Sequence, residues 1–395
     1  MALLSHEGGG ISSVSHGLAA GLAKKKTEVT IFTTTTSNVQ SITETSGHYT
    51  VVSLPMVDLP PRSLWFHLRN SNTLSNMLKD YDVVHAVSPE MALPFVSFKK
   101  LKKPLITTVH GSHRATLRAF ALSPLRSWTL GDFTFNVLEL PLHEITTRRC
   151  FERSDMIAVC SYSTLAEIRE LEKVDVSRAE VIHNGIDFRE IDNGAGNVAL
   201  KREDEEKLTI IYAGRLYWMK GVFLLLNAFI KVKKEIKNVQ LKIFGRGPLE
   251  RKLEQLIANA GLEREVLLGG FIPHARLIEE IKKSDLAVFP SIYESQPMFV
   301  LETMACKKTI LTFDLPYARE IVKNQHTGML AQAYDVEDLA ARAEEALKND
   351  DLRQRIGQNA YDYVRRKHDW DKQAGKYLAL YEKGIDSYRL NRLSF

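Results

Sequence analysis

Short apolar runs rich in valine and isoleucine alternate with helical patterns along the whole chain, and this alternation limits the fold more than any other feature. Each run is bounded by polar residues or by glycine and proline, which is typical of a strand buried on both faces. Such an alternation favours parallel sheets covered by helices. The runs form two series, "EVTIFTT", "DVVHAVS", "PLITTVH", "DMIAVCS" and "EVIH" in the first half, and "LTIIYAG", "VQLKIFG", "EVLLGG", "DLAVFPS" and "TILTF" in the second.

The length of 395 residues exceeds what one hydrophobic core usually organises. We therefore predict two doubly wound α/β domains, residues 1–186 and 187–368, with a cleft between them. The Gly-rich and then densely charged stretch at 193–207 is typical of a solvated connection near the domain break. Residues 369–395 have a helical pattern with more apolar positions than the second sheet needs.

The composition excludes several classes of protein. Hydrophobic residues make up 44% of the chain and charged residues 26%, as in ordinary soluble domains. The net charge of +5 suits anionic small molecules or acidic lipid headgroups; without a basic stripe or a recognition motif, no nucleic-acid partner is expected. Cys150, Cys160 and Cys306 show no paired spacing, which favours reduced thiols. With no long apolar run and no secretory signal, we expect a cytoplasmic protein.

Ligands of open α/β sheets bind at the carboxyl ends of the strands, so the loops after the strands hold the candidate residues. Gly9 and Gly10 precede a helix with small residues on one face, and their backbone would allow close approach of a phosphate or sugar. A plain tight turn is the alternative. His110 ends the run "TTVH", where it would serve in acid/base work or bind a sugar hydroxyl, unless it is only a satisfied polar side chain.

Two loops of the second half carry phosphate-binding features. In "AGRLYWMKG", Arg215 and Lys220 follow a strand and precede a helix, where two cations would neutralise a diphosphate leaving group. The alternative is a pair of solvated surface cations. In "FGRGP", Gly245 and Gly247 would let a base or phosphate approach the backbone, although an ordinary turn requires no ligand.

The stretch "YESQPMFVLE" places Glu294 in a loop and Glu302 on the helix that follows, with Pro297 expected at the first helical position. Carboxylates accept hydrogen bonds from two hydroxyls at once, so this pair would grip a polyol or ribose. A glycosidase-type pair is the alternative, but no third supporting carboxylate stands out. The triplets at 80–82 and 369–371 are D-x-D sequences that do not end strands, so we expect no metal site.

Taken together, these loops resemble glycosyltransferase family 4, the retaining nucleotide-sugar transferases of the GT-B fold. The resemblance runs in order over nearly the whole chain, through the N-terminal "GGG", "DVVHAVSP", "TTVHGSH", "SDMIAVCSYS", "VIHNGID", "AGRLYWMKG", "IFGRGP", "SDLAVFPSIYESQPMFVLETMAC" and "TGML". It implies two Rossmann-like domains facing a central cleft, with helix 369–395 packing back on the first domain through Tyr377, Leu378 and Tyr381.

The resemblance also implies roles for individual residues. Arg215 and Lys220 would hold the donor diphosphate, Glu302 the nucleotide ribose and Glu294 the transferred sugar. His110 would lie near the reacting sugar, and Gly9 and Gly10 would form the loop over the donor phosphates. The implied reaction transfers a sugar from a UDP- or GDP-sugar to an acceptor hydroxyl with retention and without a metal or other cofactor.

Two departures from the family pattern concern the donor loop. Ser295, Gln296 and Pro297 replace the usual "G-F-G" step after Glu294, and Lys307 stands where glycine is usual. Three alternatives stay open: a nucleotide-sugar epimerase, a sugar phosphorylase, whose cofactor lysine is not found, and a nucleotide-sugar-binding module without turnover.

The acceptor is expected to enter through the first domain, where two stretches interleave arginine with large apolar residues. Our hypothesis is that both seat the protein against the inner face of an anionic membrane and that the acceptor is a lipid or lipid-linked glycan. The alternative is that they pack on their own domain. The residues concerned are Arg62, Trp65, Phe66 and Arg69 within 60–70, and Arg114, Arg118, Phe120, Arg126, Trp128, Phe133 and Phe135 within 113–142.

Overall fold

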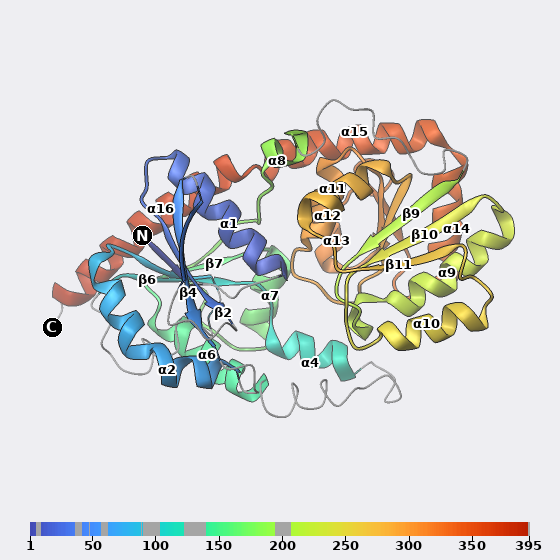
Figure 1. The fold of residues 1–395 in the computed structure, drawn as a ribbon. Helices are drawn as coiled ribbons and strands as arrows, with labels where there is room; N and C mark the ends of the chain where they lie inside the picture. The colour runs from blue at the N-terminus through green and yellow to red at the C-terminus, as the bar shows by residue number, and fades with distance from the viewer. Residues whose placement is uncertain are drawn as a thin grey trace. The chain divides into compact units, whose positions relative to one another are not determined.

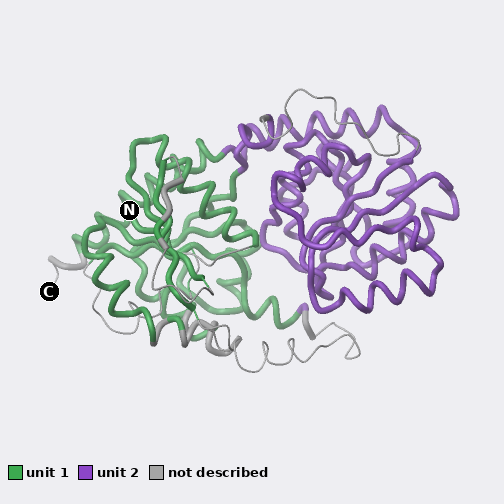
Figure 2. The backbone as a smooth tube through the Cα atoms, viewed as in Figure 1, with its two compact units in different colours: residues 1–118, 128–185, 370–395 green, residues 119–127, 186–369 purple. Residues whose placement is uncertain are grey.

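The computed structural model describes residues 1–4, 9–35, 42–46, 48–56, 62–87, 89, 103–121, 140–193 and 207–393. The chain divides into two compact units, shown in Figure 2. Unit 1 comprises Met1–Arg118, Trp128–Gly185 and Trp370–Phe395, and unit 2 comprises Ala119–Ser127 and Ile186–Asp369.

Unit 1 is built on a sheet of eight strands in the order β3-β4-β2-β1-β5-β6-β7-β8 (Figure 1). All neighbouring strands are parallel except β3 and β4, which pair antiparallel at one edge. This edge hairpin was not predicted: β3, "ITETS", lacks the apolar run by which the buried strands were recognised, and β4, "YTVVSLP", was overlooked although it holds Val51, Val52 and Leu54. The strands are β1 (Ala2–Leu4), β2 (Thr30–Thr35), β3 (Ile42–Ser46), β4 (Tyr49–Pro55), β5 (Val84–Ala86), β6 (Leu105–Val109), β7 (Met156–Val159) and β8 (Ala179–Val181).

The C-terminal helix α16 (Trp370–Leu393) packs in unit 1 against α1 (Gly9–Lys24), β6 and β7. The small residues of α1 make room for it, because a Cβ atom on Gly17 would lie 2.0 Å from Nε1 of Trp370. Tyr377 and Tyr381 are buried as the helix crosses the sheet. The other helices of unit 1 are α2 (Arg62–Met77), the short η1 (Leu78–Asp80), α4 (His113–Ala121), α6 (Leu140–Arg153) and α7 (Tyr162–Glu170).

Unit 2 has a sheet of six parallel strands in the order β11-β10-β9-β12-β13-β14. Numbered from β9, this is the 3-2-1-4-5-6 order of dinucleotide-binding domains. The central strands are buried on both faces, whereas the edge strand β11 exposes half of Leu267, so full burial of its run was a wrong expectation. The strands are β9 (Leu208–Ala213), β10 (Val239–Phe244), β11 (Val266–Gly270), β12 (Leu286–Phe289), β13 (Ile310–Phe313) and β14 (Met329–Ala331).

Helices cover both faces of this sheet (Figure 1). Pro297 caps α12 rather than opening it, because its ψ of 125° is extended and the helix begins one residue later. The helices of unit 2 are α8 (Phe188–Asn193), η5 (Trp218–Lys220), α9 (Val222–Glu235), α10 (Glu250–Asn259), α11 (His274–Lys283), α12 (Met298–Ala305), α13 (Pro316–Ile321), α14 (Val336–Lys348) and α15 (Asp350–Lys367).

Lys307, which replaces the family's usual glycine, follows α12 with a left-handed φ of 58°. This conformation favours glycine after a helix, which explains the family pattern. The lysine backbone lies so close to α15 that a Cβ atom on Gly357 would be 2.1 Å from its carbonyl oxygen. Its ammonium lies 4.7 Å from the centre of the Tyr361 ring, a cation–π contact that offsets part of the backbone strain.

A Ser-Asp pair precedes one strand in each unit, and its aspartate performs the same task in both. Oδ2 of Asp155, before β7, accepts a hydrogen bond from the Leu105 N–H at 2.9 Å. Oδ2 of Asp285, before β12, accepts from the Thr209 N–H at 2.8 Å. Each carboxylate satisfies an N–H near the start of a neighbouring strand, that of the first residue of β6 and that of the second residue of β9. Burial raises the pKa of Asp155 to about 6.

We predict that Asp155→Ala lowers the free energy of unfolding by about 1–3 kcal/mol, since a buried N–H loses its acceptor. Asp155→Asn keeps an acceptor and should cost much less. Because the pKa of Asp155 is raised from 3.8 to about 6, its contribution to stability is lost as the pH rises through that window. The free energy of unfolding of Asp155→Asn, measured with urea, should therefore rise relative to that of the wild type between about pH 4 and about pH 7. If the difference in free energy of unfolding between the two proteins stayed constant across that pH range, the raised pKa of Asp155 would be contradicted.

Candidate functional site

The candidate site of unit 2 lies where its strand order reverses, between β9 and β12. Ligands of open α/β sheets bind outside the carboxyl ends of the strands at such a reversal of strand order. Three loops border this point, 214–221 after β9, 245–249 after β10 and 290–297 after β12. They hold the predicted residues of the second half, except Glu302, which lies on α12.

The β9 loop is hydrogen-bonded directly to the β12 loop. The carbonyl of Met219 accepts from the Ile292 N–H at 2.8 Å, and the Ser291 hydroxyl oxygen lies 3.0 Å from the same carbonyl oxygen. Next to it, Gly221 has a φ of 69°, and a Cβ atom there would lie 1.9 Å from the carbonyl oxygen of Pro290. Glycine at this position therefore permits the contact that brings the two loops together.

The β10 loop packs against the other side of the β9 loop. Leu216 donates its N–H to the Arg246 carbonyl at 2.9 Å and accepts from the Leu249 N–H at 3.2 Å. A Cβ atom on Gly245 would lie 1.9 Å from the Gly214 carbonyl oxygen, and one on Gly247 would lie 2.5 Å from that of Leu216. Both glycines thus have a packing role of their own, and their predicted donor-binding role stays a prediction.

Lys220 and Glu294 meet where the β9 and β12 loops join. The ammonium of Lys220 donates to Oε1 of Glu294, and the Ser291 hydroxyl donates to the same oxygen at 2.9 Å. Tyr317 in turn donates to the Ser291 carbonyl at 3.0 Å. An ammonium has three N–H donors. Lys220 can therefore hold the carboxylate and contact a phosphate oxygen at the same time.

Arg215 and Glu302 are positioned by different partners. The guanidinium of Arg215 is exposed, lies 4.7 Å from the centre of the Tyr217 ring and donates to the Tyr217 hydroxyl at 3.1 Å. The carboxylate of Glu302 is buried on α12. Among the described residues, contacts join Lys220 to Glu294, but none joins Arg215 to Glu302. That Arg215 and Glu302 bind one and the same ligand therefore stays a prediction.

His274 contacts Glu302 and was missed by the sequence analysis. Its Nε2 lies 2.9 Å from Oε1 of Glu302, and its Nδ1 lies 2.9 Å from Oε1 of Glu190. Hydrogen bonds to Glu190 and Glu302 raise the pKa of His274 to about 10, so the ring is an imidazolium at neutral pH. The same contact lowers the pKa of Glu190. Its position at the start of a helix after a strand was the available signal.

The predicted residues of unit 1 lie on elements of its own sheet. Gly9, with a φ of 73°, and Gly10 open α1 and are exposed. His110 directly follows β6. On the neighbouring strand, His85 bonds to Tyr381 and Thr108 at 2.9 and 2.6 Å. Burial, with a smaller effect of His110, lowers the pKa of His85 to about 3, so His85 is neutral.

Comparison with known proteins decides the family. The family model "Glycosyltransferase Family 4" matches residues 8–190, and the model "Glycosyl transferases group 1" matches residues 199–363. The chain belongs to the family 4-like glycosyltransferases. The glycosyltransferase is 27% identical over 252 residues to an uncharacterized glycosyltransferase of Methanocaldococcus jannaschii. That match covers 62% of this chain and 64% of the relative, which is less than two thirds of the relative's length.

Two solved structures are similar to nearly the whole glycosyltransferase. Sucrose-phosphate synthase from Thermosynechococcus elongatus has a TM-score of 0.78 at 18% identity, over 97% of this chain and 98% of that one. Anabaena HepE, in complex with UDP-glucose, has a TM-score of 0.71 at 16% identity, over 96% and 99% of the two chains. These likenesses and the two Rossmann-like sheets confirm the predicted GT-B fold.

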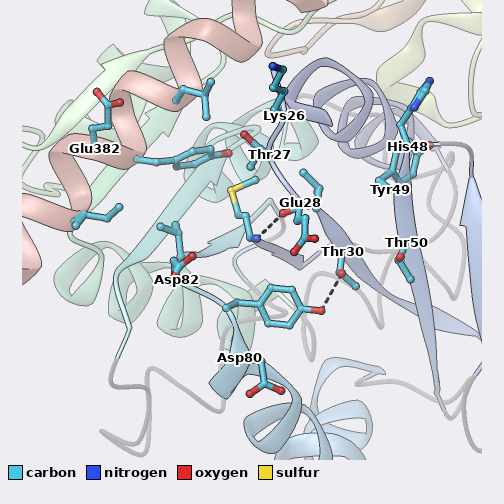
Figure 3. A pocket seen from close by; sticks show the side chains of 17 residues that line it. Lys26, Thr27, Glu28, Thr30, His48, Tyr49, Thr50, Asp80, Asp82 and Glu382 are labelled. Carbon is cyan, nitrogen blue, oxygen red and sulfur yellow. Dashed lines mark hydrogen bonds between the residues drawn. The ribbon is translucent and has the colours of Figure 1, made fainter. Parts of the chain in front are cut away.

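A pocket in unit 1 of the glycosyltransferase is lined by residues that include Lys26, His48, Asp80 and Glu382 (Figure 3). Its lining includes Glu28, Thr30, Asp82 and Val83, which precede or begin β2 and β5, so it opens at the amino ends of the strands. Ligands of open α/β sheets bind at the opposite edge. We therefore do not assign the donor to this pocket.

The two D-x-D triplets have other surroundings in the glycosyltransferase. Asp80 and Asp82 line the pocket in unit 1, and Asp371 pairs with Lys24 at 2.6 Å. Within the described ranges, no cluster of three or more His, Cys, Asp or Glu side chains is arranged to hold a metal ion. Over those same ranges, no helix combines the length and apolarity that crossing a bilayer requires.

The acceptor stretches of the glycosyltransferase are only partly described. Phe66 is 1% exposed and packs in the core of unit 1, so its predicted place at a membrane-facing surface is wrong. Arg114 pairs with Glu144 at 2.6 Å, while Arg69 and Arg118 are exposed. The side chains of Arg62, Trp65 and Phe120, and residues Arg126, Trp128, Phe133 and Phe135, lie outside the described part.

We predict that Gly245→Ala destabilises the glycosyltransferase by more than Gly261→Ala does. Both glycines have positive φ, 130° and 65°, but only at Gly245 would the added Cβ atom meet a backbone oxygen. Gly261→Ala should cost about 1 kcal/mol for its backbone conformation alone, and Gly245→Ala several times that. Urea unfolding of both variants measures the difference. Equal midpoints would show that the β10 loop does not need the close approach.

Proposed function

We propose that this chain transfers a sugar, with retention of anomeric configuration, from a UDP- or GDP-sugar to an acceptor hydroxyl. The ion pair between Lys220 and Glu294 at the reversal of the strand order carries this proposal. It places a cation suited to phosphate and a carboxylate suited to sugar hydroxyls side by side.

The diphosphate is assigned to Lys220 and Arg215, which border the same loop. Departure of the nucleoside diphosphate places negative charge on its oxygens, and fixed cations near those oxygens lower the barrier. Lys220 is held by Glu294 before any ligand binds, so its ammonium needs little reorganisation. Arg215 is exposed and would close on the phosphates from the solvent side. Gly9 and Gly10 would approach the same phosphates from unit 1.

The sugar is assigned to Glu294 as a holder rather than as a covalent nucleophile. Its Oε1 already accepts hydrogen bonds from Lys220 and Ser291, so this oxygen is engaged and poorly placed to attack a carbon atom. We therefore favour attack of the acceptor hydroxyl on the face that the diphosphate leaves. The C–O bond to the phosphate breaks, the new glycosidic bond forms, and the hydroxyl proton passes to the departing phosphate oxygen. His110 would bind a hydroxyl of the sugar.

The nucleoside is assigned to Glu302, whose remaining carboxylate oxygen would accept from the ribose hydroxyls. A uridine donor is supported by the complex of HepE with UDP-glucose, a structure similar to this chain in fold. No residue of this chain is assigned to the base or to a particular sugar.

Lys220→Ala is expected to lower donor turnover by about 100- to 1000-fold, the usual effect of removing one preorganised group that stabilises transition-state charge. Release of free UDP or GDP from a panel of nucleotide sugars measures turnover. NMR of the glycoside product would establish the anomeric configuration.

Lys231→Ala is the matched control, because Lys231 is a lysine of the same unit that pairs with Glu337 at 2.6 Å on the surface. It should keep wild-type turnover. Equal turnover in the wild type and Lys220→Ala would contradict the assigned role, and nucleotide-sugar binding without any turnover would favour the binding-module alternative. A product of inverted configuration would contradict retention.

The acceptor is proposed to be a lipid or lipid-linked glycan, reached by peripheral contact of unit 1 with an anionic membrane. The net charge of +5 and the exposed side chains of Arg69 and Arg118 support this proposal. The burial of Phe66, on α2, counts against membrane binding through this aromatic side chain.

The double variant Arg69→Ser/Arg118→Ser is expected to bind anionic vesicles more weakly than the wild type, by about 1 kcal/mol for each arginine at low salt. Co-sedimentation with phosphatidylglycerol vesicles and with neutral phosphatidylcholine vesicles measures this. Wild-type protein that ignores both kinds of vesicle would remove the membrane from the proposal, without affecting the transfer reaction.

A further inference from the structure

The bridge formed by Glu190, His274 and Glu302 links three separate helices of unit 2. Glu190 lies on α8, His274 is the first residue of α11, and Glu302 lies on α12. Both ring nitrogens of His274 are 2.9 Å from a carboxylate oxygen. An ionised carboxylate only accepts hydrogen bonds, so both nitrogens of the ring must donate.

This bridge restricts the carboxylate of Glu302. The side chain of Glu302 is 7% exposed, and its Oε1 is occupied by His274. The ring cannot turn without breaking its contact with Glu190, so His274 holds Oε1 of Glu302 in one place. With one oxygen held and the side chain buried, the carboxylate has little freedom to reorient.

The bridge is not required to attach α8 to the rest of unit 2. Phe188 and Ile191 of α8 are buried in the hydrophobic core of the unit. The ammonium of Lys282, on α11, donates to the Ile191 carbonyl. Arg365, on α15, pairs with Asp192 at 3.5 Å. Because these contacts already hold the helix, a purely structural role does not account for the charged bridge to Glu302.

We propose that His274 is a positioning residue for donor recognition. Clamped by Glu190, it orients the Glu302 carboxylate to select a nucleotide with both ribose hydroxyls, an inference that rests on the proposed function of the site. Removal of His274 should therefore weaken recognition of the ribose more than it affects the chemical step.

The test compares UDP with 2′-deoxy-UDP, and GDP with 2′-deoxy-GDP, by isothermal titration calorimetry. The wild type should prefer the ribonucleotide. His274→Gln should lose about tenfold of that preference, the effect of one misplaced charge-assisted hydrogen bond. It should raise KM for the nucleotide sugar while kcat changes little.

His326→Gln is the matched control, because His326 is an exposed histidine of unit 2 with a hydrogen bond to Asn359. It should keep the wild-type preference. Glu190→Gln, on the partly exposed side of the bridge, should also lower the preference for the ribonucleotide, but by less than His274→Gln does. In a Glu302→Gln background, His274→Gln should add no further loss, since both act through one carboxylate.

Two outcomes separate the inference from the function on which it rests. If the wild type prefers ribonucleotides and His274→Gln keeps that preference, the positioning role is overturned and the proposed function stands. If the wild type binds neither UDP nor GDP, the proposed function fails and the inference fails with it. If His274→Gln unfolds, an unchanged preference in Glu190→Gln would overturn the positioning role.

Discussion

The interlocking of the loops after β9, β10 and β12 is the constraint on which the rest of the candidate site depends. A parallel sheet leaves its loops free to separate at the point where the strand order reverses. Here the Met219 carbonyl accepts from the Ile292 N–H of the β12 loop, and Leu216 exchanges hydrogen bonds with the β10 loop. These backbone contacts need glycine where a Cβ atom would intrude, at Gly221 and Gly245. The charged side chains are therefore carried by a framework that is fixed before a ligand arrives.

Backbone N–H groups are also satisfied at the amino ends of the strands, where two aspartates accept their hydrogen bonds. Asp155 and Asp285 each accept from an N–H near the start of a neighbouring strand, one in each unit. The two sheets thus share this device, at the β6–β7 pair in unit 1 and at the β9–β12 pair in unit 2. The repetition is local, because the edge hairpin of β3 and β4 has no counterpart among the described strands of unit 2. Unit 1 also accommodates α16, for which α1 provides glycine at position 17.

Much of this could be predicted from the sequence, because buried parallel strands leave a clear apolar pattern. The central strands, the helix that holds Glu302 and the two-domain GT-B fold followed from that pattern and from the motifs. The hairpin of β3 and β4 did not, since β3 lacks such an apolar run and β4 was overlooked. His274 escaped notice because its role depends on partners 84 and 28 residues away, Glu190 and Glu302. Such spacing has no signature in a single sequence.

The pairing of acids with cations explains how the site can hold buried carboxylates without a ligand. A buried carboxylate is unfavourable unless it is paired and hydrogen-bonded. Glu294 is paired with Lys220, and Glu302 with the imidazolium of His274. Each pair uses one carboxylate oxygen, so the other stays available to accept from a hydroxyl. A neutral hydroxyl adds a hydrogen bond without displacing either cation, whereas an anion would have to be met by the remaining donors of Lys220 and by Arg215. The proposed assignment of the sugar to the acids and of the diphosphate to the cations rests on this charge balance.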